Sequence, residues 1–329
     1  MGCEYIFNGN PYSSYQELID GFSDADLENA LSILFSQTDK QTAVFDSLME
    51  LKKKHQYTWS EYNGIDGEPS LEVGDRMSIQ KFIDSHYFMI DGKPPMFKLD
   101  RDEYLKHKKK ELVSSEVMTE EDAEAYVHTI QENWDTVGKD AFDLHKLLVS
   151  TKGGDELSYQ ELSASAGQTA FANIAHKVVN ASSDIISKVF LKNGADKVGA
   201  GNKGRLIKNI NLSAELIGLD KEIVGHIDYL IVRDNGDIEV FNLKTSTESY
   251  SSWDSVKKEK YRYQMALLKR ILEFNGISAK NIRMNIIPVK LTYNSTFEYV
   301  TNIEVESVVP MDFKDQEYIL RIKDHHSKI

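Results

Sequence analysis

The chain of 329 residues is longer than one typical domain, so we expect two domains or one core with a large appendage. Its hydrophobic fraction of 41% and its charged fraction of 28% exclude a largely disordered chain. The sequence has no apolar run long enough to span a bilayer, and its net charge of −13 argues against a protein that coats nucleic acid non-specifically.

The N-terminus and the single cysteine bear on the compartment. The opening stretch MGCEYIFNGN lacks the basic and apolar segments of a secretory signal, and Ile6 stands where a myristoylation signal has Ser or Thr. Cys3 alone cannot form an internal disulfide, which fits a reducing compartment. We therefore expect a cytoplasmic protein with no membrane partner.

Residues 1–115 are predicted to form a small acidic α+β appendage. A strand at 5–7 precedes helical patterns at about 13–22, 24–36 and 39–55. The chain then becomes rich in Gly, Pro, Asp and aromatic residues, with strand-like pieces at 87–90 and 96–99. A charged helix at about 101–113 follows. This appendage shows no catalytic constellation, and we expect it to offer a surface for a protein partner.

Residues 116–329 are predicted to form an α/β core. Thr119 begins a helical segment over about 120–150, which Gly138 is expected to interrupt or bend, and more helix follows over about 158–191. The Gly-rich stretch at 193–204 lacks the pattern of a phosphate-binding loop, so we interpret it as a connection. Strand patterns over 205–244, a helix over about 252–274 and further strands then predict a mixed sheet of four or more strands flanked by helices.

The stretch GHIDYLIVRDNGDIEVFNLKT, residues 225–245, predicts two strands around a tight turn. Asn242 and Lys244 are two residues apart on one strand and therefore share a face, whereas Glu239 points the other way. A two-residue turn would put Asp228 opposite Leu243, on the wrong face. A three-residue loop with a left-handed Gly236 puts Asp228 opposite Asn242 and stacks apolar pairs on one face, so we predict the three-residue loop.

An acid, an amide and a lysine gathered in this way are typical of metal-assisted phosphodiester hydrolysis. Hard cations such as Mg²⁺ or Mn²⁺ prefer anionic oxygen ligands. The metal polarises the phosphate and lowers the pKa of an attacking water, while a lysine orients that water or stabilises the charge of the transition state.

Four motifs resemble the PD-(D/E)XK nuclease superfamily. GHIDYLIV and IEVFNLKT resemble its Gxx-D and (D/E)-x-K motifs, and YRYQMALLKRIL resembles the Gln-bearing helix of its RecB-like branch. WDTVGKDAFDLHKLL resembles that branch's upstream helix, which carries a metal-binding His. The resemblance covers about residues 130–292 and implies a PD-(D/E)XK-type core of the kind found in phage and recombination nucleases.

The resemblance assigns roles to individual residues. Asp228 is implied as a metal ligand, Lys244 as the catalytic lysine, His145 as a further ligand and Gln264 as a group that contacts substrate or positions the site. Asn242 takes the place of the second acid and offers a carbonyl oxygen without charge, which weakens metal binding. His176 competes with His145 for the role of helix ligand.

Two functions of different class remain open at this point. The first is a metal-dependent DNA nuclease, located in a host cytoplasm or a virion if phage-encoded, and weakened or abolished by Asn242. The second is an inactive relative that binds DNA or protein as a structural module, which the missing acid and the net charge favour. A basic strip is expected to contact nucleic acid, and it consists of Lys257, Lys258, Lys260 and Arg262.

Overall fold

A computed structural model shows the architecture of the chain. It describes residues 5–7, 10–12, 40–54, 72–73, 76–85, 101–150, 159–190, 204–215, 222–277 and 282–311. The helical patterns at 13–22 and 24–36, the strand-like pieces at 87–90 and 96–99, and nearly all of the Gly-rich connection lie outside these ranges.

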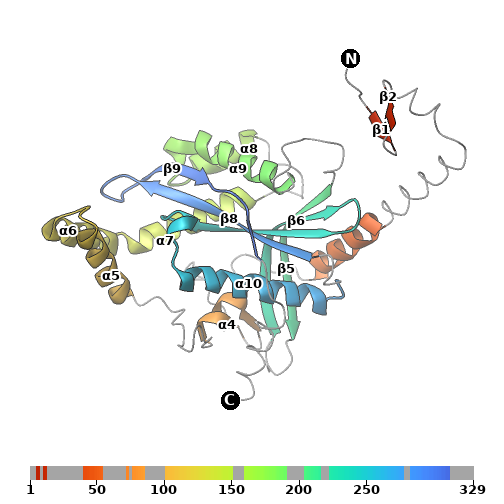
Figure 1. Cartoon of the computed structure of the whole chain (residues 1–329), viewed down its shortest axis with the longest axis horizontal. Helices are drawn as coiled ribbons and strands as arrows, with labels where there is room; N and C mark the ends of the chain where they lie inside the picture. Colours follow the sequence, from red (N-terminus) through yellow and green to blue (C-terminus); the bar gives the residue numbers. More distant parts are fainter. Residues whose placement is uncertain are drawn as a thin grey trace, which may run out of the picture.

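An eight-stranded mixed sheet forms the core (Figure 1). Its order is β10-β8-β7-β6-β4-β3, with β5 paired to β6 and β9 paired to β8. The strands are β3 (Glu72–Val73), β4 (Arg76–Ser78), β5 (Gly204–Glu215), β6 (Glu222–Arg233), β7 (Ile238–Ser246), β8 (Ile282–Tyr293), β9 (Val300–Val305) and β10 (Val309–Pro310). The pairs β4–β6 and β7–β8 are parallel and the others antiparallel. A separate antiparallel pair joins β1 (Tyr5–Phe7) and β2 (Asn10–Tyr12).

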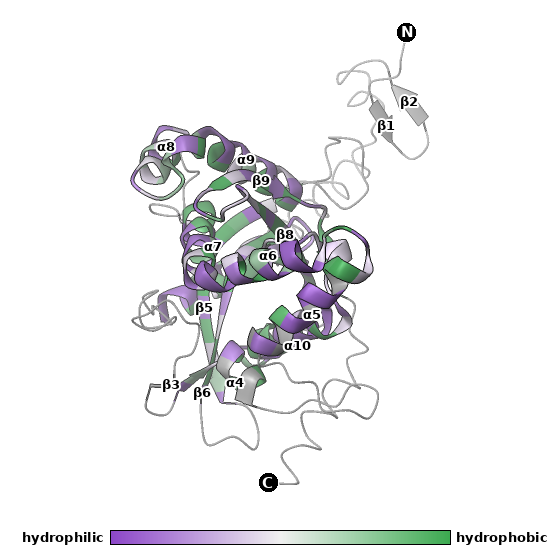
Figure 2. Ribbon diagram, turned by 90° about the vertical axis from the view of Figure 1, so that its left-hand side faces the viewer, coloured by the Kyte–Doolittle hydropathy of each residue, from purple (hydrophilic) through white to green (hydrophobic). Residues whose placement is uncertain are grey.

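Helices cover both faces of this sheet (Figure 1). One face packs against α7 (Trp134–Val149), α8 (Tyr159–Gly167) and α9 (Ala175–Phe190). The other packs against α4 (Ile79–Ser85), α10 (Ser255–Phe274) and a helix over residues 40–54. Figure 2 shows the hydrophobic residues gathered along the strands, between the hydrophilic outer faces of the helices. The predicted class, a mixed sheet flanked by helices, is confirmed.

Burial on both faces explains why the central strands are apolar along most of their length. Nearly every residue of β6 is buried, and so are the first six residues of β7. A strand covered on both sides loses the alternation of polar and apolar residues that marks a half-exposed strand. A polar residue in such a strand must therefore find a partner inside the protein.

The helical segment over 120–150 is divided at Asn133, not at Gly138. Residue 133 ends α6 (Glu120–Glu132), where its amide Nδ2 donates to the carbonyl of Thr129 at 2.9 Å, and α7 begins at the next residue. Gly138 lies inside α7 with open space around its Cα. The predicted interruption at Gly138 is therefore wrong, and the break falls at Asn133, whose side chain caps the end of α6. The predicted start at Thr119 is confirmed, since its hydroxyl accepts from the N–H of Asp122.

Residues 76–85 pack into the same core as the second half of the chain. The strand β4 pairs in parallel with the beginning of β6, with Met77 opposite Ile223. Phe82 and Ile83, on the helix α4 that follows, are buried in the cluster beneath α10. The predicted domain boundary at residue 115 therefore does not separate this segment from the sheet. Helix α5 (Arg101–Ser114) follows and packs against α6.

Candidate functional site

The site lies where β6 and β7 separate. Their ladder runs from Val232 opposite Ile238 to Tyr229 opposite Phe241, and it stops there. The connecting loop contains three residues, and Gly236 has a left-handed φ of +83°. This confirms the predicted register, in which the next pair is Asp228 opposite Asn242.

The two strands diverge beyond this ladder because β6 exchanges one partner for another. Residues 222–224 pair with β4, and β5 pairs along the other edge of β6. Residues 225–228 therefore lie between two neighbours on the same edge. We call the region formed by residues 225–228 and 242–244 the fork.

Asn242 bridges the fork with its side-chain amide. Its Nδ2 donates to the carbonyl of His226 at 3.0 Å, and its Oδ1 accepts from the N–H of Asp228 at 3.2 Å. The amide thereby satisfies two backbone groups that the ladder leaves open, which buried groups require. This use needs a donor and an acceptor on one side chain, and a carboxylate offers only acceptors.

Asp228 is buried in the fork and hydrogen-bonded through both carboxylate oxygens. Oδ1 lies 2.9 Å from Nε2 of His145 and 3.3 Å from Nε2 of His226, and Oδ2 accepts from the N–H of Leu243 at 2.7 Å. Burial acts to raise the pKa of Asp228, but the charges and hydrogen bonds of the two imidazoles hold it well below its usual range. The carboxylate is therefore ionised at neutral pH.

The structure brings His145 to Asp228 and leaves His176 exposed on α9. It also adds His226, which the sequence analysis did not select. Nδ1 of His226 lies 2.6 Å from Oδ1 of Asn211 on β5, which fixes the ring beside the carboxylate. The signal was present in the sequence, because His226 stands two residues before Asp228 on one strand and therefore on the same face.

Lys244 extends from β7 toward α10. Its Nζ donates to Oε1 of Gln264 at 2.7 Å and lies 4.8 Å from the centre of the Tyr261 ring. Burial lowers the pKa of Lys244 to about 8, the charge of Asp228 opposes that shift, and Lys260 adds to it. Nε2 of Gln264 in turn hydrogen-bonds Oε1 of Gln80 on α4, so the segment 76–85 also contributes to the site.

Gly225 explains how α4 and α10 come so near the fork. A Cβ at this position would lie 2.5 Å from Cδ2 of Leu268 on α10 and 2.8 Å from Cδ1 of Ile79 on α4. Both distances are far below van der Waals contact, so a larger residue would force the side chains of Leu268 and Ile79 to shift. The glycine three residues before Asp228 thus leaves the space that these two side chains occupy.

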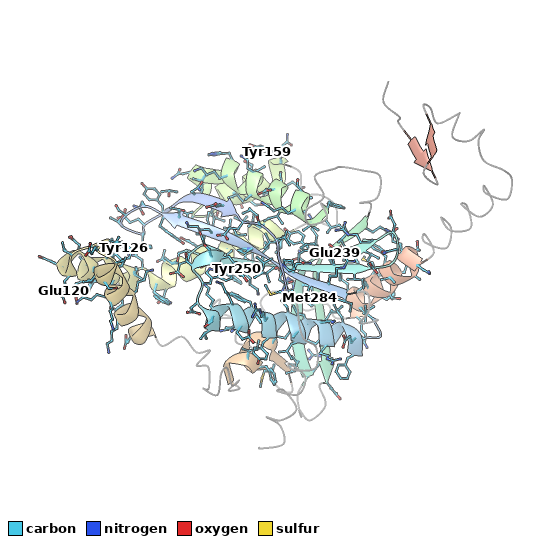
Figure 3. The ribbon with its side chains drawn as sticks, viewed as in Figure 1. Glu120, Tyr126, Tyr159, Glu239, Tyr250 and Met284 are labelled. Atoms are coloured by element: carbon cyan, nitrogen blue, oxygen red, sulfur yellow. The ribbon has the colours of Figure 1, made fainter. Side chains whose placement is uncertain are left out.

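Glu239 lies on the opposite face, as predicted. Its carboxylate pairs with Arg233 at 3.0 Å and with Arg283 at 3.2 Å. The Arg233 guanidinium also donates to the last carbonyls of α9, at Val189 and Phe190. Figure 3 labels Glu239 on the sheet, where Arg233 links it to the end of α9, and Met284 belongs to the cluster that packs against α10. Glu239 therefore serves packing and does not replace the acid missing at position 242.

The four cations of the predicted basic strip lie in different surroundings at the beginning of α10. Nζ of Lys257 donates to Ser246 at 2.9 Å and lies over the Trp253 ring, and Lys258 lies over Tyr250. Lys260 is near enough to Lys244 to lower its pKa, and exposed Arg262 pairs with Glu259. Tyr250 lies at the end of β7 away from the turn (Figure 3). The cations are thus interleaved with aromatic rings, which the sequence analysis did not note.

Binding of Mg²⁺ or Mn²⁺ requires several ligand atoms around one point. Among the described residues, no group of three or more His, Cys, Asp or Glu side chains is arranged to hold a metal ion. Asn242 Oδ1 is already engaged by a backbone N–H. The fork thus offers one carboxylate, that of Asp228, and both of its oxygens are hydrogen-bonded within the protein.

Comparisons with known proteins add little to this geometry. No protein-family model matches the sequence, and no curated protein matches it. A solved structure described as "Putative exonuclease" from Eubacterium rectale is 16% identical, covers 53% of this chain and 67% of its own, and has a TM-score of 0.28. The structure of SSO0001 is 14% identical, covers 58% and 86%, and has a TM-score of 0.24. Similarity at this level carries no weight for function.

Each helix in the described part of the chain is too short or too polar to cross a lipid bilayer.

Proposed function

We propose that the chain hydrolyses phosphodiester bonds of DNA in a metal-dependent reaction at the fork, as a RecB-like member of the PD-(D/E)XK nucleases. The observation that carries the proposal is the contact between an ionised Asp228 on β6 and His145 on α7, together with a half-buried Lys244 on β7 that lies near enough for the charge of Asp228 to act on its pKa. Titratable groups whose pKa values are shifted by burial and by charged partners are candidates for functional sites.

The proposal gives a role to the polar residues at the fork and to the side chains that contact them. Asp228 and His145 would hold the cation, and His226 and the N–H of Leu243 fix the carboxylate in place. When bound, the cation would polarise a phosphate and lower the pKa of an attacking water. Lys244 supplies a positive charge beside the developing negative charge, and Gln264 holds its Nζ in position.

The substrate would lie along the beginning of α10. Lys257, Lys258, Lys260 and Arg262 are the cations proposed to contact its phosphates, and stacked Tyr and Trp rings support two of them. On a chain with net charge −13, such a local strip favours binding at one place over coating of the polymer. A protein partner would bind through the first 115 residues.

A second function is favoured by one observation. Both polar groups of Asn242 are hydrogen-bonded to the backbone, so the residue stabilises the fork where an acid would bind metal. A chain built in this way could bind DNA and leave it intact. The two functions differ in whether metal binding survives without the second acid.

Asn242→Asp is the substitution that separates them. It removes the donor to the His226 carbonyl and adds a negative charge beside Asp228, so we expect a loss of about 1–3 kcal/mol of stability in chelator. The same charge should strengthen Mn²⁺ binding, so added Mn²⁺ should raise the melting temperature of the variant more than that of the native chain. Asn242→Ala is the control, since it loses both bonds of the amide and adds no charge.

Three measurements complete the test, namely Mn²⁺ affinity by calorimetry, nicking of single-stranded DNA and nicking of duplex DNA. Cleavage by the native chain that Lys244→Ala abolishes establishes the nuclease. Cleavage gained only with Asn242→Asp identifies a disabled nuclease. If neither protein cleaves DNA or binds Mn²⁺, the proposed chemistry is wrong.

A further inference from the structure

The alternation of side chains along β6 breaks at Asp228. Ile227 and Leu230 both lie in the cluster beneath α10, although they are three residues apart, while Tyr229 lies in the cluster beneath α7. In a regular strand, residues three apart face opposite sides. Asp228 contacts His145 on α7, so it lies on the same side as its neighbour Tyr229, although continued alternation from Tyr229 would turn it toward α10.

The partner strand β5 breaks at the same place. Ile207 and Ile210 both lie in the cluster beneath α10, although they too are three residues apart. The pairing with β6 keeps its register through the break, with Ile210 opposite Ile227. The residue opposite Asp228 is therefore Asn209.

Asn209 has a backbone conformation that is rare within a strand. Its φ is +52°, in the left-handed region that most residues avoid and that Gly, Asn and Asp tolerate. One left-handed residue redirects the strand and moves the following side chains to the other face. The break in β5 thus has a local cause, and the facing break at Asp228 follows from the shared ladder.

The side chain of Asn209 anchors the helix that carries His145. Its Nδ2 donates to the carbonyl of Val149, the last residue of α7, at 2.7 Å. The hydroxyl of Tyr229 donates to the neighbouring carbonyl of Leu148 at 2.5 Å. Carbonyls at the end of a helix lack partners within the helix, so these two bonds hold the last turn of α7 against the sheet, one turn after His145.

We propose that Asn209 is the positioning residue of the His145–Asp228 pair. Its left-handed backbone turns the strand pair so that Asp228 faces α7, and its amide ties down the end of α7 so that His145 meets the carboxylate. Asn209 on β5 thus positions both His145 and Asp228, the two partners of the contact. The positioning rests on geometry alone, and its consequence for cleavage rests on the proposed nuclease function.

Two substitutions separate the two parts of this role. Asn209→Gly keeps the left-handed backbone and removes the amide, whereas Asn209→Val removes the amide and disfavours the left-handed backbone as well. Asn285→Ala is the matched control, because Asn285 is a buried strand asparagine whose Nδ2 likewise donates to one carbonyl, that of Val240.

The readout is the ring nitrogen and ring N–H resonances of His145 and His226 in the ¹⁵N-histidine-labelled full chain, assigned with His145→Gln and His226→Gln. We expect Asn209→Gly to shift the His145 signals toward those of a solvated imidazole and to leave the His226 signals in place. Asn209→Val should shift both sets. Where the native chain cleaves DNA, kcat should fall by about tenfold to a hundredfold with KM unchanged.

Circular dichroism and a cooperative melting transition establish that each variant folds, and Asn209→Gly serves if Asn209→Val does not. If folded Asn209→Gly leaves the His145 signals at their native positions, the amide does not position α7 and the proposal is wrong. It is equally overturned if Asn285→Ala moves the His145 signals as far. The resonance measurement needs no cleavage, so it remains decisive if the chain cuts no DNA.

Discussion

The two ends of the β6–β7 hairpin satisfy their buried polar groups in different ways. At the turn, backbone groups pair with one another, and the charges of Arg233 and Glu239 neutralise each other against the end of α9. At the fork, the ladder has stopped, and the side chains of Asn242 and Asp228 hydrogen-bond the open backbone groups.

Residues at the turn therefore contribute to stability alone, whereas residues at the fork contribute both to stability and to the proposed chemistry. The Arg233–Glu239 pair is buried and bound to Arg283 and to the last carbonyls of α9, so its contribution is to hold the fold together. Asn242 and Asp228 hold the strands together, and Asp228 and Lys244 are the groups proposed to act on a substrate. A substitution at the turn should therefore change stability alone, and one at the fork should change both.

The largest expected effect is at the turn. Glu239→Ala leaves the buried Arg233 guanidinium without its carboxylate, which should lower the free energy of unfolding by about 3–5 kcal/mol. The double variant Arg233→Met with Glu239→Leu should recover most of that loss, because an apolar pair leaves no buried charge. Urea unfolding measures both, and Mn²⁺ affinity should stay unchanged. A loss below about 1 kcal/mol would show that the pair is not desolvated.

Lys244→Met should have a smaller effect, of opposite sign. Burial lowers the folded-state pKa of Lys244 to about 8 from the ordinary lysine value of 10.5, so the unfolded state binds more protons between these values. The native chain therefore carries the full penalty below pH 8 and loses it as the pH rises toward 10.5. We expect the variant to be more stable at neutral pH by about 1–2 kcal/mol, after allowing for the lost Gln264 hydrogen bond.

Unfolding curves at neutral pH and at about one unit below the unfolded-state pKa test this sign. The advantage of Lys244→Met should shrink at the higher pH, while any cleavage is lost at both. A variant that is less stable than the native chain at neutral pH would mean that Lys244 stabilises the fork, contrary to its burial.

The smallest effect is expected outside the fork. Lys258→Gln and Arg262→Gln should leave stability nearly unchanged and should each reduce the salt dependence of DNA binding by about one phosphate contact. Lys53→Gln is the control, because Lys53 is an exposed lysine on the helix over residues 40–54. Fluorescence anisotropy over a range of salt concentrations measures the slopes. Equal slopes for all three variants would remove the strip from the proposed DNA path.

Local patterns predicted the hairpin and its register. The Asn-Gly pair limits the turn to a few geometries, and the apolar pairs select the one that buries them together, as the structure shows for Leu230 and Val240. The helix that carries His145 was found through its resemblance to a family motif. The convergence of His145 with Asp228 then depends on packing between segments 83 residues apart.

What the sequence analysis missed depends on non-local structure. The pairing of β4 with β6, which brings Gln80 to Gln264, joins segments 146 residues apart and leaves no local pattern. The break of alternation at Asn209 and Asp228 arises from one left-handed residue, and asparagine adopts this conformation in few of its positions. His226 differs from these, because its spacing from Asp228 was legible in the sequence.

The parallel pairing of β4 with β6 has a consequence for how the protein is made. Residues 76–78 leave the ribosome long before residues 222–224, and they must remain available until β6 arrives to complete the sheet. Contacts this distant in sequence are slow to form, and an unpaired strand edge invites pairing with another chain in the interval. A shortened protein that lacks residues 72–85 would keep that edge of β6 open permanently, so we expect it to aggregate during synthesis although Asp228, Asn242 and Lys244 are all present.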